Sequence, residues 1–393
     1  MIKQKIFNVA CLLVALSLPS TLLAKEKIGL VLGGGGARGA AHVGVLKVIE
    51  EQGIAIDYIA GTSMGAIVGS LYASGYSADE IEAIIHDINW SDGLTDASPR
   101  DLNSVQRKID EAFLPSHVEV GIGSDGIKTP QGLIQGQHLN LMLRKYLSGH
   151  ESVKHFDKLP IPFRAVACDI VTGEKVVLSS GDLVSAVRAS MSVPGVFQPI
   201  RIDDHLLIDG GVVDNVPVQV VKDMGATKLI VVDVGSPLFD ESKLTSPLSV
   251  TEQVFTVMIQ KVTAASVALL GDTDVMIRPE LGDITSEDFI RSAEAIPLGE
   301  AAAVAQLEHL RPLQSTQERY LDFQSTHQRT ALDAFVVAEI KVDDTQTDTA
   351  QRIETQFAEL VDQEVGRGHV EAVISELYGT GRYQLMTYTV EPL

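Results

Sequence analysis

A serine between two glycines and a glycine-rich loop are the residues of this sequence best suited to chemistry. Ser63 lies in the Gly-Thr-Ser-Met-Gly sequence of residues 61–65, directly after an apolar stretch at residues 58–60. Residues 33–39 read Gly-Gly-Gly-Gly-Ala-Arg-Gly and follow an apolar run at residues 27–32. Such a serine turn exposes the hydroxyl, and such a loop lets backbone N–H groups converge on a negative charge. Acyl transfer requires both features, so the pattern predicts a serine hydrolase.

The serine needs a base, and Asp209 is the strongest candidate. It ends an apolar stretch at residues 206–208 and precedes Gly210 and Gly211, which predicts a carboxylate at a strand terminus, near the serine turn. A carboxylate can take the serine proton if partial burial raises its pKa or if a close hydrogen bond holds it. The alternative is an Asp-Gly turn between strands without a catalytic role. The residues by themselves leave both interpretations open.

Three histidines compete with Asp209 for the role of base. His309 follows the Ser-Asp-His order of the α/β-hydrolases, but Ser63 comes too early in the chain for the strands that precede the nucleophile in that fold. The alanine-rich, helical surroundings of His309 favour a surface position. We expect His42 to pack in a helix or to support the glycine loop, and His205 to lie in a loop.

The glycine loop has a second interpretation, as a dinucleotide-binding turn. Gly34, Gly36 and Gly39 satisfy the G-x-G-x-x-G pattern after a strand. Such a site requires an acidic residue about twenty positions further on, at the end of the next strand. Glu50 lies in an apparent helix and Asp57 precedes a strand. The fit is poor, so acyl transfer is the favoured interpretation.

The elements that must position these residues alternate between strand and helix. Apolar runs predict strands at residues 163–168, 175–178, 228–234 and 274–277. Helical spacing of apolar residues predicts helices at residues 44–51 and 67–73. The run at 228–234 resembles a parallel strand that is buried on both faces. The alternation predicts an α/β fold with a mostly parallel central sheet flanked by helices. Ligands of such sheets bind beyond the carboxyl ends of the strands, where both glycine motifs lie.

Composition sets the class of protein and of partner. The chain has 393 residues, 45% of them hydrophobic, and a formal net charge of −21. A surface this acidic repels nucleic acid and gains little binding energy from anionic lipid head groups. Any membrane contact must therefore be local and apolar. Residues 1–24 combine two lysines with a short apolar run, which predicts a signal peptide and export to the periplasm, the outer membrane or the exterior. Removal of the signal peptide leaves Cys168 as the one cysteine of the mature chain, which excludes an internal disulfide.

Together the motifs resemble those of the patatin-like phospholipase family, over residues 27–313. The family pattern is a G-G-G-x-[RK]-G loop, then G-x-S-x-G, then D-G-[AG]. This chain has all three in that order, at residues 34–39, 61–65 and 209–211. Two longer stretches, at residues 188–197 and 209–217, are similar to bacterial members of the family.

The resemblance implies a role for each matching residue. Ser63 would be the nucleophile and Asp209 its partner in a Ser-Asp dyad that needs no histidine, cofactor or metal. The oxyanion hole would be formed by groups of the loop and of the helix that follows the serine, at Gly34, Gly35, Gly36, Arg38 and Met64. Arg38 would add positive potential, orient the loop or form a structural ion pair. The remaining motif glycines are Gly39, Gly61, Gly65, Gly210 and Gly211.

The sequence predicts four segments, at residues 1–24, 25–313, 314–330 and 331–393. They are the signal peptide, the catalytic domain, a polar linker and a small module. Residues 92–158 of the catalytic domain are irregular and predict an insertion that caps the site. The module reads as a strand at 335–342, two helices and a strand at 383–390. It resembles an incomplete POTRA module, the periplasmic domain before outer-membrane β-barrels in a self-secreting patatin-like class, so a barrel partner or a missing barrel domain is expected.

The resemblance implies an exported lipid acyl hydrolase of the phospholipase A type. Its substrates would be phospholipids or related acyl esters, met at a membrane surface, and not nucleic acid. One alternative is a catalytically silent lipid-binding or secretion-associated module, in which Ser63 would be dispensable. A nucleotide-dependent enzyme is a second alternative and would bind NAD or ATP saturably.

Overall fold

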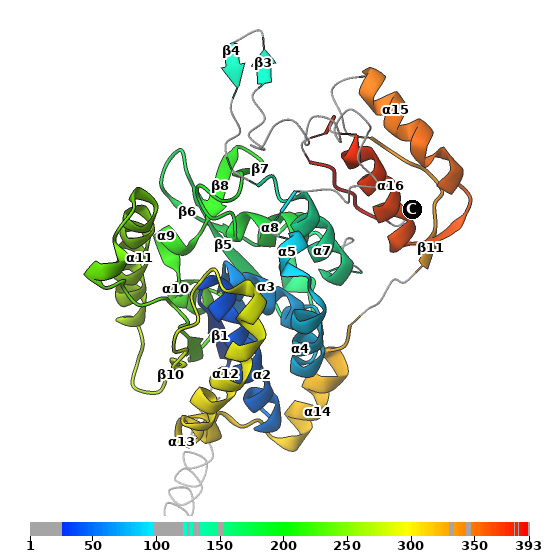
Figure 1. Ribbon diagram of the computed structural model, residues 1–393. Coiled ribbons are helices and arrows are strands. Elements are labelled where there is room, and N and C mark those ends of the chain that lie inside the picture. Colours follow the sequence, from blue (N-terminus) through cyan, green and yellow to red (C-terminus); the bar gives the residue numbers. More distant parts are fainter. Residues whose placement is uncertain are drawn as a thin grey trace, which may run out of the picture.

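A central sheet carries both glycine motifs (Figure 1). The computed structural model describes residues 26–93, 95–96, 121–123, 126–128, 132, 134–147, 149, 153–329, 334–342, 347–380, 382–383 and 385–391. Parallel strands follow the order β10 (Val275–Ile277), β9 (Lys228–Val232), β1 (Ile28–Leu32), β2 (Tyr58–Thr62) and β5 (Phe163–Asp169). The predicted α/β class with a mostly parallel sheet is confirmed.

The edges of β5 determine how the remaining strands join the sheet. β6 (Lys175–Leu178) and β8 (His205–Asp209) run antiparallel to β5, and β7 (Ile200–Ile202) pairs antiparallel with β8. On β5, Ala165 pairs with both β2 and β6, and Ala167 pairs with both β6 and β8. Because a strand has two hydrogen-bonding edges, β6 occupies one of them. β2 and β8 therefore share the other edge and meet end to end.

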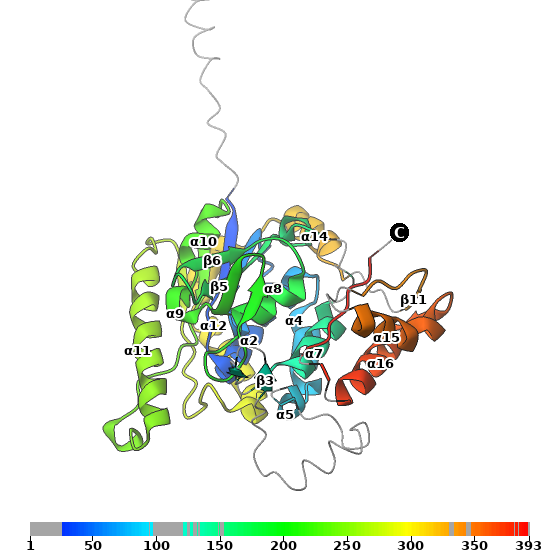
Figure 2. The same ribbon diagram turned by 90° about the horizontal axis from the view of Figure 1, so that it is seen from above.

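Helices cover both faces of the sheet (Figures 1 and 2). Leu30 and Leu32 of β1 belong to one apolar core with α2 (Ala41–Glu51) and α3 (Met64–Ala73). Val31 belongs to a second core with α10 (Val218–Asp223). β1 is thus buried on both faces, as its apolar run predicts.

The other helices of this domain lie around the sheet (Figures 1 and 2). They are α4 (Ala78–Asp87), α8 (Leu183–Ser190), α9 (Gly211–Asp214), α11 (Pro247–Val267), α12 (Ala295–Val304) and α13 (Leu307–Leu310). Short 3-10 helices are η1 (Gly36–Ala40), η3 (Glu241–Lys243), η4 (Phe289–Glu294) and η5 (Arg311–Leu313). Within the ranges that the structure describes, no helix has both the length and the apolar character needed to cross a membrane.

The predicted insertion at residues 92–158 is described in part. Its elements are α5 (Trp90–Gly93), β3 (Gly121–Gly123), β4 (Gly126–Lys128), α7 (Gln137–Leu147) and η2 (Phe156–Lys158). The Asp96 carboxylate accepts the N–H groups of Gly136 and Gln137, both at 3.0 Å, at the start of α7. α7 packs against α8, which contacts the serine turn. That this region caps the active site stays a prediction.

The segment predicted as a linker, residues 314–330, contains helix α14 (Gln317–Thr326). This helix packs on the sheet domain. Arg319 forms an ion pair with Asp57 at 2.5 Å, and the Tyr320 hydroxyl donates to the carbonyl of Glu50 at 2.9 Å. The polar composition therefore reflects a helix with one exposed face and not an extended connection.

The C-terminal module contains β11 (Ala334–Val336), α15 (Thr347–Phe357), η6 (Ala358–Leu360), β12 (Glu364–Gly366) and α16 (Arg367–Gly379). Both helices lie where the sequence predicts them, whereas the first strand ends at Val336 and does not extend over the predicted range 335–342. The predicted strand at 383–390 is wrong, because the described residues of that range form no strand. The Met386 N–H and carbonyl instead bond to the side-chain amide of Gln137, at 2.7 and 2.9 Å. A side chain thus satisfies the groups that a neighbouring strand would have paired. The POTRA resemblance stays a prediction.

Candidate active site

Ser63 occupies a strained turn between β2 and α3. Its backbone φ is 54°, in the left-handed region that residues with a side chain rarely adopt. Packing requires the two glycines around it: a Cβ on Gly61 would lie 2.2 Å from the carbonyl oxygen of Gly65, and one on Gly65 would lie 2.2 Å from that of Leu32. The G-x-S-x-G spacing therefore lets strand and helix cross at backbone contact and holds the serine at the carboxyl end of β2.

Asp209 reaches Ser63 because β8 and β2 end against each other. Thr62, the last residue of β2, pairs with Val166 of β5. Asp209, the last residue of β8, pairs with the next residue of β5, Ala167. The two chain segments arrive from opposite directions along one edge, so Ser63 and Asp209 meet where the strands stop.

The Ser63 hydroxyl lies beside the Asp209 carboxyl group. The N–H of Gly211 donates to Oδ1 of the same carboxyl at 2.7 Å. Both Ser63 and Asp209 are 8% exposed. Burial raises the pKa of Asp209 from 3.8 to about 6, although the nearby Ser63 hydroxyl and the Gly211 N–H act to lower it. A carboxyl that ionises close to neutral pH suits a general base.

The glycine loop passes directly beside the serine. A Cβ on Gly34 would lie 3.1 Å from the Cβ of Ser63. The N–H of Gly34 holds the loop in place, because it donates to the carbonyl of Asn215 at 3.1 Å. The N–H groups of Gly35 and Gly36, by contrast, donate to no acceptor among the described residues. Of the three glycines predicted for the oxyanion hole, Gly35 and Gly36 therefore have the available donors.

The loop and the start of α3 are packed too closely for side chains. Gly36 has φ 57°, and a Cβ there would lie 2.1 Å from the carbonyl oxygen of Ser286. A Cβ on Gly39 would lie 2.3 Å from Cγ of Met64. Met64 is the first residue of α3, where backbone N–H groups have no partner within the helix. The Met64 N–H is thus a third donor at the same place as Ser63.

Arg38 holds the loop in position. Its guanidinium is buried and donates to the carbonyls of Val234, Ile284 and Gly235 at 2.9, 2.6 and 3.2 Å. Burial lowers the pKa of Arg38, and the nearby Asp233 carboxylate raises it. Of the roles considered from the sequence, these contacts favour orientation of the loop.

The three histidines are engaged elsewhere. His42 is buried, and its Nε2 lies 2.8 Å from the carbonyl oxygen of Gly33. Because desolvation lowers the pKa of His42 to about 4, the neutral ring donates Nε2–H to that carbonyl and supports the loop. His205 is the first residue of β8 and not a loop residue as expected, and its Nδ1 lies 2.8 Å from Oδ2 of Asp169; His309 is exposed on α13.

The dinucleotide interpretation finds no support in the fold. Asp57 lies before β2, at the amino end of the sheet, and binds Lys27 and Arg319 at 2.8 and 2.5 Å. An acid that contacts a ribose would lie at the carboxyl end of that strand. The described residues also contain no group of three or more metal-ligating side chains that could hold an ion.

Two polar residues without an assigned role in the sequence analysis support the site. Ser190 accepts the Ser63 N–H on its Oγ at 3.0 Å and donates to the carbonyl of Val166 at 2.6 Å. The side-chain amide of Asn215 donates to the carbonyl of Gly34 at 3.2 Å. Both residues are buried. Each lies in one of the two longer stretches that resemble the family, which was the signal available in the sequence.

Replacing Ser190 by alanine is expected to lower turnover by about tenfold to a hundredfold and the free energy of unfolding by about 1–3 kcal/mol. The buried Ser63 N–H would lose its acceptor, and the strained turn would shift. Kinetics and urea denaturation measure the two effects. Ser70→Ala is the matched control, because the Ser70 hydroxyl is buried in α3 but bonds to the carbonyl of Ile67. Unchanged turnover in Ser190→Ala would contradict the supporting role.

Comparison with known proteins agrees with this geometry. Residues 30–222 match the sequence model of the patatin-like phospholipase family. "Patatin-like phospholipase domain-containing protein ZK370.4" of Caenorhabditis elegans is 36% identical over 55% of this chain and 14% of its own length. An uncharacterized NTE family protein of Mycobacterium bovis is 34% identical over 53% of this chain and 49% of its own length. Residues 30–222, just under half of this chain, are therefore similar to a patatin-like phospholipase domain.

The chain thus spans less than half the length of either relative. Among solved structures, VipD from Legionella pneumophila has a TM-score of 0.41 and 16% identity, over 72% of this chain and 66% of VipD.

Proposed function

We propose that this protein is an exported lipid acyl hydrolase of the phospholipase A type, with Ser63 and Asp209 as its catalytic dyad. The observation that carries the proposal is that the ends of β2 and β8 bring Ser63 and the buried Asp209 carboxyl together, beside the open amides of Gly35 and Gly36. The similarity to a patatin-like phospholipase domain supports a lipid acyl ester as the substrate.

The reaction proceeds through an acyl-enzyme. Ionised Asp209 takes the Ser63 proton while Oγ attacks the ester carbonyl carbon, and the N–H groups of Gly35, Gly36 and Met64 stabilise the resulting oxyanion. The ester C–O bond then breaks, and Asp209 passes the proton to the leaving lysophospholipid oxygen. Water repeats the sequence: Asp209 takes its proton, the oxygen attacks the acyl carbon, and Ser63 regains a proton as the fatty acid leaves.

The apolar face of α11 is the proposed membrane contact. Val254 and Met258 lie one turn apart on this helix and are 54% and 43% exposed. Ile259 of the same helix lies 3.7 Å from the position of a Cβ on Gly211, so α11 borders the dyad. With a formal net charge of −21, the protein gains little from anionic lipid. A neutral bilayer surface that accepts apolar side chains fits this face better.

Replacing both Val254 and Met258 by aspartate is expected to slow hydrolysis of phosphatidylcholine vesicles about tenfold or more, because insertion of each side chain contributes about 1–2 kcal/mol. Hydrolysis of a soluble short-chain ester should change little, since the dyad is untouched. Val304→Asp, at a similarly exposed valine at the end of α12, is the matched control. An equal loss on both substrates would contradict the proposed contact.

Export rests on residues 1–24, which lie outside the described residues. When the full chain is expressed in a bacterial host, we expect it outside the cytosol, with Lys25 as its first residue. N-terminal sequencing of the fractionated protein tests this. A cytosolic protein that begins at Met1 would contradict export.

Labelling by a fluorophosphonate probe, together with fatty-acid release from phosphatidylcholine vesicles, tests the function. Both are expected in the wild type without added metal or nucleotide. A folded wild-type protein that shows neither would favour the catalytically silent lipid-binding module instead.

A further inference from the structure

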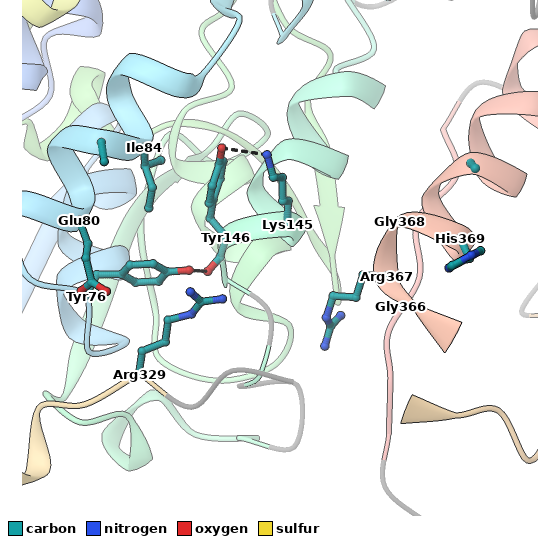
Figure 3. A pocket seen from close by; sticks show the side chains of 12 residues that line it. Tyr76, Glu80, Ile84, Lys145, Tyr146, Arg329, Gly366, Arg367, Gly368 and His369 are labelled. Atoms are coloured by element: carbon teal, nitrogen blue, oxygen red, sulfur yellow. Dashed lines mark hydrogen bonds between the residues drawn. The ribbon is translucent and has the colours of Figure 1, made fainter. Parts of the chain in front are cut away.

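A second site is indicated by a cavity of about 780 Å³ between the sheet domain and the C-terminal module (Figure 3). One wall is formed by Tyr76, by α4 and α7, and by Arg329 after α14, and the other by the start of α16. The residues that line it do not include those around Ser63. Its charged lining consists of Lys145, Arg329, Arg367 and Glu80, together with the ring of His369.

The carboxylates at this cavity have local partners. Glu80 caps the start of α4, where it accepts the Ser77 N–H at 2.8 Å and the Ser77 hydroxyl at 3.0 Å. Asp87 accepts Lys145 at 3.3 Å and the Tyr146 hydroxyl at 2.8 Å. Among the described residues the lining holds more lysine and arginine side chains than carboxylates, even when Asp87 is counted against Lys145, in a chain of formal net charge −21. Such a local excess of positive charge favours an anionic ligand.

Two arginines reach into the cavity from opposite walls (Figure 3). The Arg329 guanidinium lies over the ring of Tyr76, 4.9 Å from the ring centroid, which restricts its orientation. Arg367 is 9% exposed, lies 5.8 Å from the ring centroid of Phe335 and also interacts with the Tyr388 hydroxyl. Arginines oriented in this way bind phosphate through paired N–H donors.

The start of α16 adds backbone donors to the same wall. The residue before the helix is Gly366, no side chain caps the helix, and its first turn contains no acidic residue. A Cβ on Gly368 would meet no atom within 4 Å, so the backbone is open there. The positive end of the helix dipole is therefore available to an anion between the two arginines.

We propose that this cavity binds a phosphate monoester, carried either by a small soluble molecule or by a lipid head group. The volume exceeds that of a phosphate group and is typical of sites for small organic ligands. The organic part would lie against Tyr76 and Tyr146, which also line the cavity. Because cations come from both walls, the bound ligand would fasten the C-terminal module to the sheet domain.

Two binding measurements on Ser63→Ala protein distinguish the sources at low ionic strength. Calorimetry with glycerol 3-phosphate tests a soluble ligand, and flotation with phosphatidylcholine vesicles that contain phosphatidic acid tests a lipid head group. We expect saturable binding in at least one, weakened about ten- to a hundredfold by Arg329→Gln and by Arg367→Gln. Lys341→Gln removes an exposed cation of the same module and is expected to bind normally.

No saturable binding of either probe by the folded protein would overturn the proposal. Equal binding by the Ser63→Ala protein with and without the Arg329→Gln substitution would also overturn it. Arg329 is exposed, so its replacement tests the charge even where Arg367→Gln does not fold. Because the measurements need no hydrolysis, failure here leaves the proposed function intact, and an inactive dyad leaves this binding site intact.

Discussion

Replacing Ser63 by alanine is expected to abolish fluorophosphonate labelling and to lower fatty-acid release by at least about a thousandfold. The variant lacks the oxygen that forms the acyl-enzyme, while the amides of Gly35 and Gly36 can still bind the ester. Some binding of lipid should therefore persist. Labelling is read from gels and release from phosphatidylcholine vesicles, each at equal protein concentration.

The control for this variant is Ser70→Ala, which removes another buried hydroxyl of α3. It should label and hydrolyse like the wild type. Full activity in Ser63→Ala, with an unchanged melting temperature, would remove the nucleophile from the proposed mechanism.

The rate is expected to depend on pH through Asp209. kcat/KM should rise through an apparent pKa near 6 and reach a plateau above it, because only the ionised carboxyl can take the Ser63 proton. Asp209→Asn is expected to lower the rate by about 10²–10⁴-fold and to abolish this rise. Rates measured across the acidic to neutral range, on a substrate without titrating groups, test both. If kcat/KM of Asp209→Asn still rises with pH, the titrating group is another residue.

The same carboxyl is expected to cost the protein stability at neutral pH. Burial raises the folded-state pKa of Asp209 to about 6, so folding favours its protonated form. The stabilisation that comes from this protonated form is complete below the pKa of Asp209 in the unfolded chain. It is lost as the pH rises through the pKa of Asp209 in the folded protein. A shift of about two units corresponds to about 3 kcal/mol.

Asp209→Asn carries no charge, so its stability relative to the wild type should increase by up to about 3 kcal/mol between acidic and neutral pH. Urea denaturation at the two pH values measures this difference. If burial does not disfavour the ionised form of Asp209, the free energies of unfolding of the wild type and of Asp209→Asn should change with pH in the same way. That result would contradict the raised pKa.

Local backbone chemistry made much of this site predictable. Gly36, Gly61 and Gly65 are spaced as the sequence pattern requires because a Cβ at each would strike a carbonyl oxygen within 2.2 Å. The exclusion at Gly61 comes from Gly65 close by in the chain, whereas those at Gly36 and Gly65 come from Ser286 and Leu32; all three still leave glycines at fixed positions in the sequence. The apolar run of β1 is equally local evidence, since burial on both faces requires it.

Other elements were not readable in the same way. The polar segment of α14 hides a helix whose contacts lie at Asp57 and Glu50, far away in the chain. The segment at 383–390 has the alternation of a strand, yet Gln137 takes the backbone groups of Met386. Both outcomes depend on partners that a local pattern does not contain.

By itself, then, the sequence determined which residues are present for chemistry: a serine on a turn, an acid after an apolar run and a loop rich in glycine. Tertiary structure alone decided that β8 runs against β5 and stops where β2 stops, which brings Asp209 to Ser63. It also decided that the Gly34 amide holds the loop while those of Gly35 and Gly36 stay open. The physical reason is that strand pairing, burial and the pKa of Asp209 arise from contacts between distant segments, which exist only once the sheet has formed.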